Sequence, residues 1–210
     1  MTAPGRFISL EGGEGAGKST QVRALAAALR ARGITVVETR EPGGSAGAEA
    51  IRTLLLTGNA DRWTPRAEAL LFAAARADHV ARVIRPALER GEWVICDRFL
   101  DSSRAYQGGA SGLDDADILE LHRIGSEAFL PDRTLVLTLD EATAQARAAA
   151  RDGDASDRIG GRDVAYHRRV AAAFTVFAEQ DPARFRLIDA GGSAADVTAH
   201  IMNALSDMLP

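Results

Sequence analysis

The chain alternates between short apolar runs and longer segments whose apolar residues recur at helical spacing. Runs typical of buried strands occur at Arg6–Glu11, Ile34–Glu38, Trp93–Cys96, Thr134–Leu139 and Phe185–Ile188. The spacing predicts helices over Ser19–Arg32, Ala48–Leu56, Pro65–Arg90, Asp115–Ala128, Ala142–Arg151 and Ala194–Leu209, the third of them kinked or split at Pro86. Strands separated by helices favour an α/β fold, with a five-stranded parallel sheet and helices on both faces.

One segment departs from this pattern. Arg151–Asp163 contains three glycines and a single large apolar residue, Ile159, among its charged side chains. Such a composition cannot pack a core, so we expect either a disordered surface loop or a mobile lid over a neighbouring site. Neither an internal repeat nor a long linker divides the sequence, and we expect residues 1–210 to form a single domain.

Composition and charge narrow the possible functions. With 29 acidic against 25 basic residues the net charge is −4, which gives no support to a general nucleic-acid binder. No apolar stretch approaches the roughly 18 residues that span a bilayer, and the N-terminus does not resemble a secretory signal. The single cysteine, Cys96, excludes an intrachain disulfide and a cysteine-cluster metal site, so we expect a cytoplasmic protein without a membrane partner.

A glycine-rich segment between the first strand and the first helix carries the strongest functional motif. GGEGAGKS at Gly12–Ser19 matches the phosphate-binding loop pattern G-x-x-x-x-G-K-[ST], in the strand–loop–helix context that the motif requires. Glycines let backbone N–H groups wrap around a phosphate, while Lys18 would bind the transferred phosphoryl group and Ser19 would bind Mg²⁺. The predicted ATP-binding residues are Gly12, Gly13, Glu14, Gly15, Ala16, Gly17, Lys18, Ser19 and Thr20.

The count of cationic residues supports this prediction. Of the 25 cationic residues, only Lys18 is a lysine and the others are arginines. A compact ammonium group fits inside a loop that wraps a phosphate, whereas the planar fork of arginine does not. The guanine-recognition motif of GTPases, N/T-K-x-D, would need a further lysine, so a switch GTPase is disfavoured.

The remaining motifs resemble those of the bacterial thymidylate kinase family. FISLEGGEGAGKST, TREPGG (Thr39–Gly44), IRTLLL (Ile51–Leu56), EALLFAAARADH (Glu68–His79) and VICDRFLDSSRAYQG (Val94–Gly108) occur in that family's order and spacing. With the charged segment they cover most of residues 6–163, and TREPGG together with DRF-x-x-SS-x-AYQG is specific. The resemblance implies a three-layer P-loop kinase fold with a mobile lid, and ATP-dependent phosphorylation of dTMP to dTDP in dTTP biosynthesis.

The resemblance also implies roles for individual residues. Arg98 would bind the acceptor phosphate, with Arg52 and Arg40 in the same cluster, and Asp97 would lie near Mg²⁺. Phe72 would stack on the thymine ring. The predicted metal ligands are Ser19 and Asp97.

Further residues would recognise the nucleoside. Arg76 would donate to the carbonyl edge of the base, and Gln107 and Ser103 would contact the base or nearby waters. Glu14 would accept a hydrogen bond from the sugar 3′-OH, while Tyr106 would crowd the 2′ position and exclude ribonucleotides. The predicted substrate-binding residues are Glu14, Arg40, Pro42, Arg52, Phe72, Arg76, Arg98, Ser103, Tyr106 and Gln107.

A catalytic arginine must come from the predicted lid. Some members of the family carry this arginine in the phosphate loop, but here that loop offers Gly15 and Ala16 instead. Arg151 is therefore the first candidate and Arg158 the second, with Arg147 flanking them. The predicted catalytic residues are Lys18, Asp97, Arg98, Arg151 and Arg158.

The resemblance implies ATP and dTMP as ligands, Mg²⁺ as cofactor and a homodimer paired through helices. Pro65–Arg90 is a candidate for the dimer contact because it carries apolar residues on more than one face. Three alternatives stay open from the sequence. They are another nucleoside-monophosphate kinase, a P-loop ATPase or switch without a small-molecule acceptor, and a nucleotide-binding module without catalytic activity.

Overall fold

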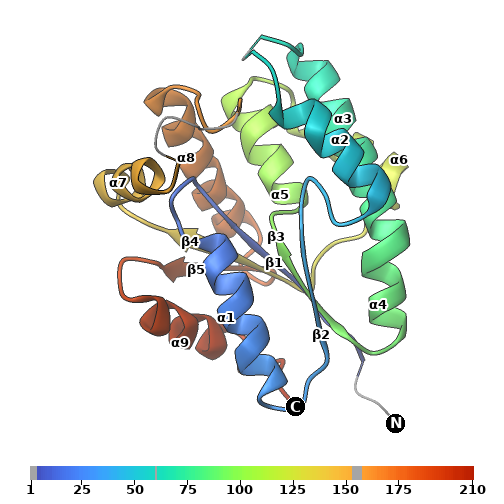
Figure 1. The fold of residues 1–210 in the computed structure, drawn as a ribbon, viewed down its shortest axis with the longest axis vertical. Helices are drawn as coiled ribbons and strands as arrows, with labels where there is room; N and C mark the ends of the chain where they lie inside the picture. Colours follow the sequence, from blue (N-terminus) through green and yellow to red (C-terminus); the bar gives the residue numbers. More distant parts are fainter. Residues whose placement is uncertain (1–3, 60, 153–157) are drawn as a thin grey trace.

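The sheet at the centre of the molecule has five parallel strands in the order β2-β3-β1-β4-β5 (Figure 1). The computed structural model describes residues 4–59, 61–152 and 158–210. The strands are β1 (Phe7–Gly12), β2 (Val36–Arg40), β3 (Trp93–Asp97), β4 (Arg133–Thr138) and β5 (Phe185–Asp189). The predicted five-stranded parallel sheet is therefore confirmed.

Helices cover both faces of this sheet. In chain order they are α1 (Lys18–Arg30), α2 (Ala46–Leu56), α3 (Pro65–His79), η1 (Val80–Ile84), α4 (Arg85–Glu89), α5 (Leu100–Ser103), η2 (Arg104–Ala110), α6 (Asp115–Ser126), α7 (Glu141–Asp152), α8 (Val164–Gln180) and α9 (Ala194–Ala204), where η1 and η2 are π-helices. Among the helices that the structure describes, none is long and apolar enough to cross a membrane.

The core divides into clusters on the two faces of the sheet because successive strand residues point to opposite sides. On one face, Ile8 and Leu10 of β1 pack with residues of α1 and α9. On the other, Phe7 packs with α3, η1, α4 and α6, and a third cluster joins η2 to α8. The result is a three-layer α/β arrangement (Figure 1), in which the central strands are buried on both sides.

Several element boundaries differ from the prediction. The second strand begins at Val36 rather than Ile34, and the last helix ends at Ala204 rather than Leu209. The long helical segment changes type at η1, which ends two residues before Pro86, whose ring nitrogen has no N–H for the backbone ladder.

Two helical regions are absent from the prediction. Helix α8 presents Val170, Phe174 and Phe177 to the core at helical spacing, but it directly follows the charged segment, which obscures where it begins. The region 100–110 combines a four-residue helix with a π-helix. A π-turn does not repeat at 3.6 residues, so the usual periodicity does not detect it.

Candidate active site

A cavity of about 630 Å³ opens where the chain leaves the carboxyl ends of β1, β2 and β3. Parallel α/β sheets place their ligands at this end because loops there can converge without blocking the strands. The structure brings most of the predicted site residues to this one cavity. Those that line it are Glu14, Gly15, Gly17, Lys18, Ser19, Thr20, Arg40, Pro42, Arg52, Phe72, Arg76, Asp97, Arg98, Ser103, Tyr106 and Gln107.

The phosphate loop occupies one end of the cavity. Gly12 has φ 133°, and a Cβ there would lie 2.5 Å from the Leu137 carbonyl oxygen, so only glycine fits. Gly17 caps α1 in the left-handed conformation, with φ 86°. The Lys18 ammonium group donates to the Gly12 carbonyl at 3.2 Å and to the Gly13 carbonyl at 2.7 Å. The loop thus closes around the ammonium group of its own lysine.

The surroundings of Lys18 lower the pKa of its ammonium group. Burial, followed by the positive charge of Arg98, lowers the pKa of the ammonium group from 10.5 to about 8. The carboxylates of Glu14 and Asp97 partly oppose this shift. Lys18 is therefore still mainly charged at neutral pH, and the negative charge of a bound polyphosphate would raise its pKa back towards the ordinary value.

Ser19 and Asp97 form a polar contact at the boundary of the phosphate loop and β3. The Ser19 hydroxyl donates to the Asp97 carboxylate at 2.5 Å. Among the described residues, no group of three or more His, Cys, Asp or Glu side chains could hold a metal by itself. Mg²⁺ in phosphoryl-transfer sites uses only one or two protein oxygens and takes its remaining ligands from phosphates and water. The chemistry of this pair fits Mg²⁺.

Arg98 lies between the phosphate loop and the rest of the cavity. Its backbone has φ 70°, a conformation uncommon for a residue with a side chain and frequent at functional sites. One guanidinium nitrogen donates to the Gly12 carbonyl at 3.1 Å and to the Ser102 hydroxyl at 3.2 Å, and the other to Glu14 at 2.5 Å. The guanidinium carbon lies 4.9 Å from the centre of the Tyr106 ring.

These neighbours keep Arg98 charged. Burial alone would lower the pKa of Arg98, but Tyr106, Glu14 and Asp97 together hold it above its ordinary value. Tyr106 also donates to Glu14 at 3.3 Å. The predicted acceptor-phosphate, 3′-OH and 2′-position residues therefore form one contiguous group.

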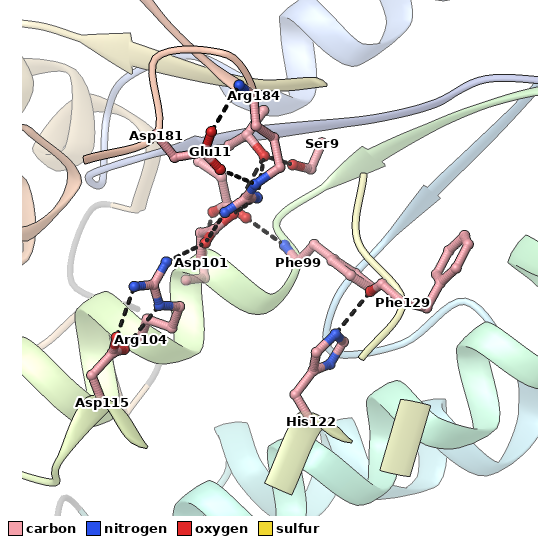
Figure 2. Close-up of polar contacts among 12 residues, drawn as sticks. Ser9, Glu11, Phe99, Asp101, Arg104, Asp115, His122, Phe129, Asp181 and Arg184 are labelled. Atoms are coloured by element: carbon pink, nitrogen blue, oxygen red, sulfur yellow. Dashed lines mark hydrogen bonds and ion pairs between the residues drawn. The ribbon is translucent and has the colours of Figure 1, made fainter. Parts of the chain in front are cut away.

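A buried polar network lies beneath the loop, and Figure 2 shows its two acids, Glu11 and Asp101. Glu11 of β1 accepts hydrogen bonds from the Phe99 N–H at 2.7 Å and from the Ser102 hydroxyl at 2.5 Å. Because Ser102 also accepts from Arg98, Glu11 lies one side chain away from the guanidinium group. Burial, and secondly the charge of Asp101, raises the pKa of Glu11 from 4.5 to about 8.

Asp101 is the other buried acid of this network. It is fully buried between two arginines that come from different parts of the chain, as Figure 2 shows. Arg184 donates to it at 2.6 Å and Arg104 at 3.1 Å. Through these two ion pairs, Asp101 links the start of η2 to the turn before β5. The links hold in place the α5–η2 segment, which carries several site residues.

The cavity's opposite end is formed by α3 and the loop after β2. Arg76 donates from Nε to Glu41 at 2.8 Å and from Nη2 to the Ser103 hydroxyl at 2.8 Å. Glu41 also contacts His79 Nδ1 at 3.0 Å. Although burial opposes its charge, Arg76 and His79 hold the pKa of Glu41 below its ordinary value. Phe72, four residues before Arg76 on the same helix, lines the same cavity.

The two further arginines predicted for the acceptor phosphate differ in how firmly they are held. Arg52 on α2 donates to the Pro42 carbonyl at 2.8 Å, which fixes it at the cavity wall. Arg40 is more than half exposed and pairs with Glu49 at 3.2 Å. Both line the cavity, so the structure brings them to the predicted cluster.

Of the predicted lid arginines, Arg147 and Arg158 have side chains that the structure describes. Arg151 lies on α7, but its side chain falls outside the described residues, as do residues 153–157. Arg158 is almost fully buried, donates to the Leu55 carbonyl at 2.8 Å and pairs with Glu68. Of these arginines, Arg147 lines the cavity, and it donates to the Ala190 carbonyl at 3.0 Å. A catalytic role for Arg151 or Arg158 stays a prediction.

Several residues that shape the site have no role in the sequence prediction. Glu41 stands inside the TREPGG motif, and that position beside a substrate-binding segment is the sequence feature that could have marked it. His79, Asp101 and Ser102 also fall within or beside predicted motifs. The contacts of these residues with Arg76, Glu41, Glu11 and Arg184 each span 35 or more residues, so the sequence does not reveal them.

Comparison with known proteins gives consistent matches along almost the whole chain. The family model described as thymidylate kinase matches residues 10–201. A thymidylate kinase of Rhizorhabdus wittichii is 66% identical over 207 residues, covering 99% of this chain and all of that protein. One of Caulobacter vibrioides is 50% identical over 207 residues, covering 98% of each. The crystal structure of a thymidylate kinase from Ehrlichia chaffeensis superimposes with a TM-score of 0.79 at 31% identity, covering 96% of this chain and 100% of that one.

Proposed function

This chain belongs to the thymidylate kinase family, and we propose that the residues gathered in the cavity carry out its reaction in the roles described below. The enzyme transfers the γ-phosphoryl group of ATP to dTMP, giving ADP and dTDP. The bond between the γ-phosphorus and the β–γ bridging oxygen breaks, and a bond from a 5′-phosphate oxygen of dTMP forms. One observation carries the assignment of roles: the phosphate loop and the predicted acceptor residues line a single cavity, with Arg98 between them.

Positioning and charge neutralisation supply the catalysis. The second pKa of a phosphate monoester is about 6, so the attacking oxygen is already ionised at neutral pH and needs no general base. Lys18 neutralises the transferring group, while Arg98 and Arg52 hold the acceptor phosphate in line with it. Glu14 accepts a hydrogen bond from the sugar 3′-OH and Tyr106 packs against the 2′ position, while Phe72 and Arg76 hold the base.

Ser19 and Asp97 would hold Mg²⁺, directly or through water. Held there, it would supply positive charge beside the phosphates of ATP. The short contact between the two side chains supports this proposal because both already converge on one point beside Lys18. An arginine from α7 or from the segment that follows it completes the charge around the γ-phosphate, and Arg147 is already at the cavity wall.

The chain acts as a single catalytic domain and as a homodimer. Leu70 on α3 and Ile124 on α6 are 56% and 67% exposed, and these helices are neighbours in the fold. Two exposed apolar side chains on adjacent helices favour a second copy of this chain as the partner. The buried free thiol of Cys96 suits a reducing compartment and supports a cytoplasmic location.

An acceptor comparison tests the function. ADP release is followed with dTMP, dUMP, dGMP and dAMP at equal concentrations, and dTMP should be the best acceptor by a wide margin. ADP release in the absence of any acceptor should be small. A preference for another monophosphate, or acceptor-independent ATP hydrolysis, would contradict the proposal.

A further inference from the structure

Glu68, in the first turn of α3, is a buried acid that the reaction described above does not use. Its side chain is 1% exposed, and it does not line the cavity. It nevertheless has three partners from two distant parts of the chain. Gln107 Nε2 donates to one carboxylate oxygen at 2.8 Å, while Arg158 and Arg162 bind the other, Arg162 at 2.9 Å.

The contact with Glu68 determines which way the Gln107 amide faces. A carboxylate paired with two arginines can only accept hydrogen bonds, so the NH₂ group of Gln107 must turn towards it. The amide oxygen is then on the other side of the group, and Gln107 lines the cavity. Among the described residues, none donates to Gln107 Oε1. The amide therefore turns its acceptor oxygen away from Glu68 and offers it to a ligand in the cavity.

Glu68 is itself held in a fixed position. Arg158 is anchored by the Leu55 carbonyl at 2.8 Å, and Arg162 by the Ser111 hydroxyl at 3.1 Å, with its guanidinium carbon 4.6 Å from the Tyr166 ring centre. The backbone that carries Gln107 is also fixed, because Tyr166 donates to the Tyr106 carbonyl at 3.0 Å. The carboxylate cannot rotate without breaking buried ion pairs.

We propose that Glu68 is a positioning residue for base selection, because it holds Gln107 with its amide oxygen presented to the base. This inference rests on the proposed function. Thymine carries an N–H donor at N3, which the amide oxygen accepts. Cytosine has a bare acceptor at N3, so two acceptors would face each other and neither would be satisfied. A site built to hydrogen-bond one group rejects the analogue that lacks it far more strongly than a purely apolar pocket can.

The test is the ratio of the dissociation constants of dCMP and dTMP, measured by calorimetry in wild type and variants. In Glu68→Gln the new amide can donate to Gln107 Oε1, so Gln107 can turn its NH₂ group towards the base. We expect the ratio to fall by about tenfold or more, since dTMP loses a hydrogen bond and dCMP gains one. If the role of Glu68 were purely structural, its replacement would weaken the binding of dTMP and of dCMP equally and leave the ratio unchanged.

Arg162→Gln is the matched control. It breaks one ion pair to Glu68 but leaves the contact between Glu68 and Gln107, so the ratio should stay within about twofold of wild type. In a Gln107→Leu background, Glu68→Gln should cause no further change, because the residue through which it acts is gone. If Glu68→Gln does not fold, Glu68→Asp replaces it in the test. This variant keeps the charge but moves the carboxylate away from Gln107, so it should also lower the ratio.

The inference is overturned if neither Glu68 variant changes the ratio, or if Arg162→Gln lowers it as much. It is also overturned if Glu68→Gln still changes the ratio after Gln107 has been replaced. A wild-type enzyme that does not bind dTMP more tightly than dCMP contradicts the proposed function itself. The two failures are therefore separated by the wild-type measurement alone.

Discussion

At the scale of single residues, the surroundings of Lys18 explain why this position alone is a lysine. Its ammonium group lies within hydrogen-bond distance of two carbonyl oxygens of its own loop, and the side chain is 7% exposed. An arginine has a wider planar head that would have to push the loop open. The chemistry of the site, rather than the composition of the chain, sets the residue type here.

We expect Lys18→Ala to lower kcat by at least about 10³-fold, because the charge that neutralises the transferring phosphoryl group is lost. The thermal midpoint should change little, since the side chain bonds only to loop carbonyls. Lys18→Arg, the matched variant that keeps the charge, should also be severely impaired. Full activity of Lys18→Arg would show that charge alone is sufficient and that the compact shape is irrelevant.

The lowered pKa of Lys18 makes a second prediction. Only the neutral amine is nucleophilic, and the pKa of about 8 means that this form appears more than two pH units below an ordinary lysine at 10.5. Acylation of Lys18, followed by mass spectrometry of its peptide, should therefore rise through pH 8. Since the chain has no other lysine, only the N-terminal amine competes, and ATP should protect Lys18 but not the N-terminus.

Glu11 predicts a pH dependence of stability. Its pKa is raised to about 8 in the native state from an unfolded value of 4.5, so between these values the native state binds more protons than the unfolded one. The free energy of unfolding should therefore fall as pH rises from 5 to 8, by up to about 1.4 kcal/mol per pH unit from this group.

Denaturant titrations of wild type and Glu11→Gln across this range test the point. The variant should show a flatter decline, because a neutral amide cannot lose a proton. Glu120→Gln, a change at an exposed pair with Arg123, is the control and should leave the slope unaltered between pH 5 and 8. Equal slopes in wild type and Glu11→Gln would mean that Glu11 is ionised throughout.

At the scale of elements, α8 shows how a segment outside the cavity stabilises it. Phe174 is 2% exposed and packs with Phe177 in the cluster that also contains Tyr106. Helix α8 thus supports η2, the π-helix on which Tyr106 and Gln107 lie. Neither the binding site nor the sequence periodicity alone would assign it this role.

Phe174→Ala should lower the free energy of unfolding by about 3–5 kcal/mol, because a large buried ring is replaced by a cavity. Val176→Ala, two residues away and 45% exposed, is the matched control and should change it by less than about 0.5 kcal/mol. Chemical denaturation gives both values. A small effect of Phe174→Ala would indicate that α8 packs loosely and does not support η2.

At the scale of the whole molecule, the apolar side chains on α3 and α6 predict the assembly. A charged residue at Leu70 would have to be buried unpaired in a homodimer, so Leu70→Glu should shift the protein from dimer to monomer. Sedimentation velocity at several concentrations measures the change. Leu187→Glu, which alters a leucine on β5 that is 49% exposed against 56% for Leu70, should leave the dimer intact. A wild-type monomer would contradict the proposed homodimer, and a Leu187→Glu monomer would place the dimer contact at β5.

By itself, the sequence determined those features that depend on neighbours along the chain. The five strands, the phosphate loop and its Lys18, and the motifs around Arg76 and Arg98 are local patterns, and the fold and family predicted from them are confirmed. Local patterns suffice there because side-chain periodicity and loop chemistry act over a few residues. Local patterns did not predict the lengths of β2 and α9 or the existence of η2, because packing sets where an element ends.

Only the tertiary structure decided which residues meet. Glu41 reaches Arg76 across 35 positions, Glu11 reaches Ser102 across 91, and Glu68 reaches Arg162 across 94. Such contacts depend on how strands are ordered and how helices pack on them, and no local pattern encodes that order. Burial then converts these distant pairs into fixed charges and oriented hydrogen bonds, because a buried polar group must find a partner. The sequence thus determined the chemistry available to this enzyme, and the fold determined where each group points.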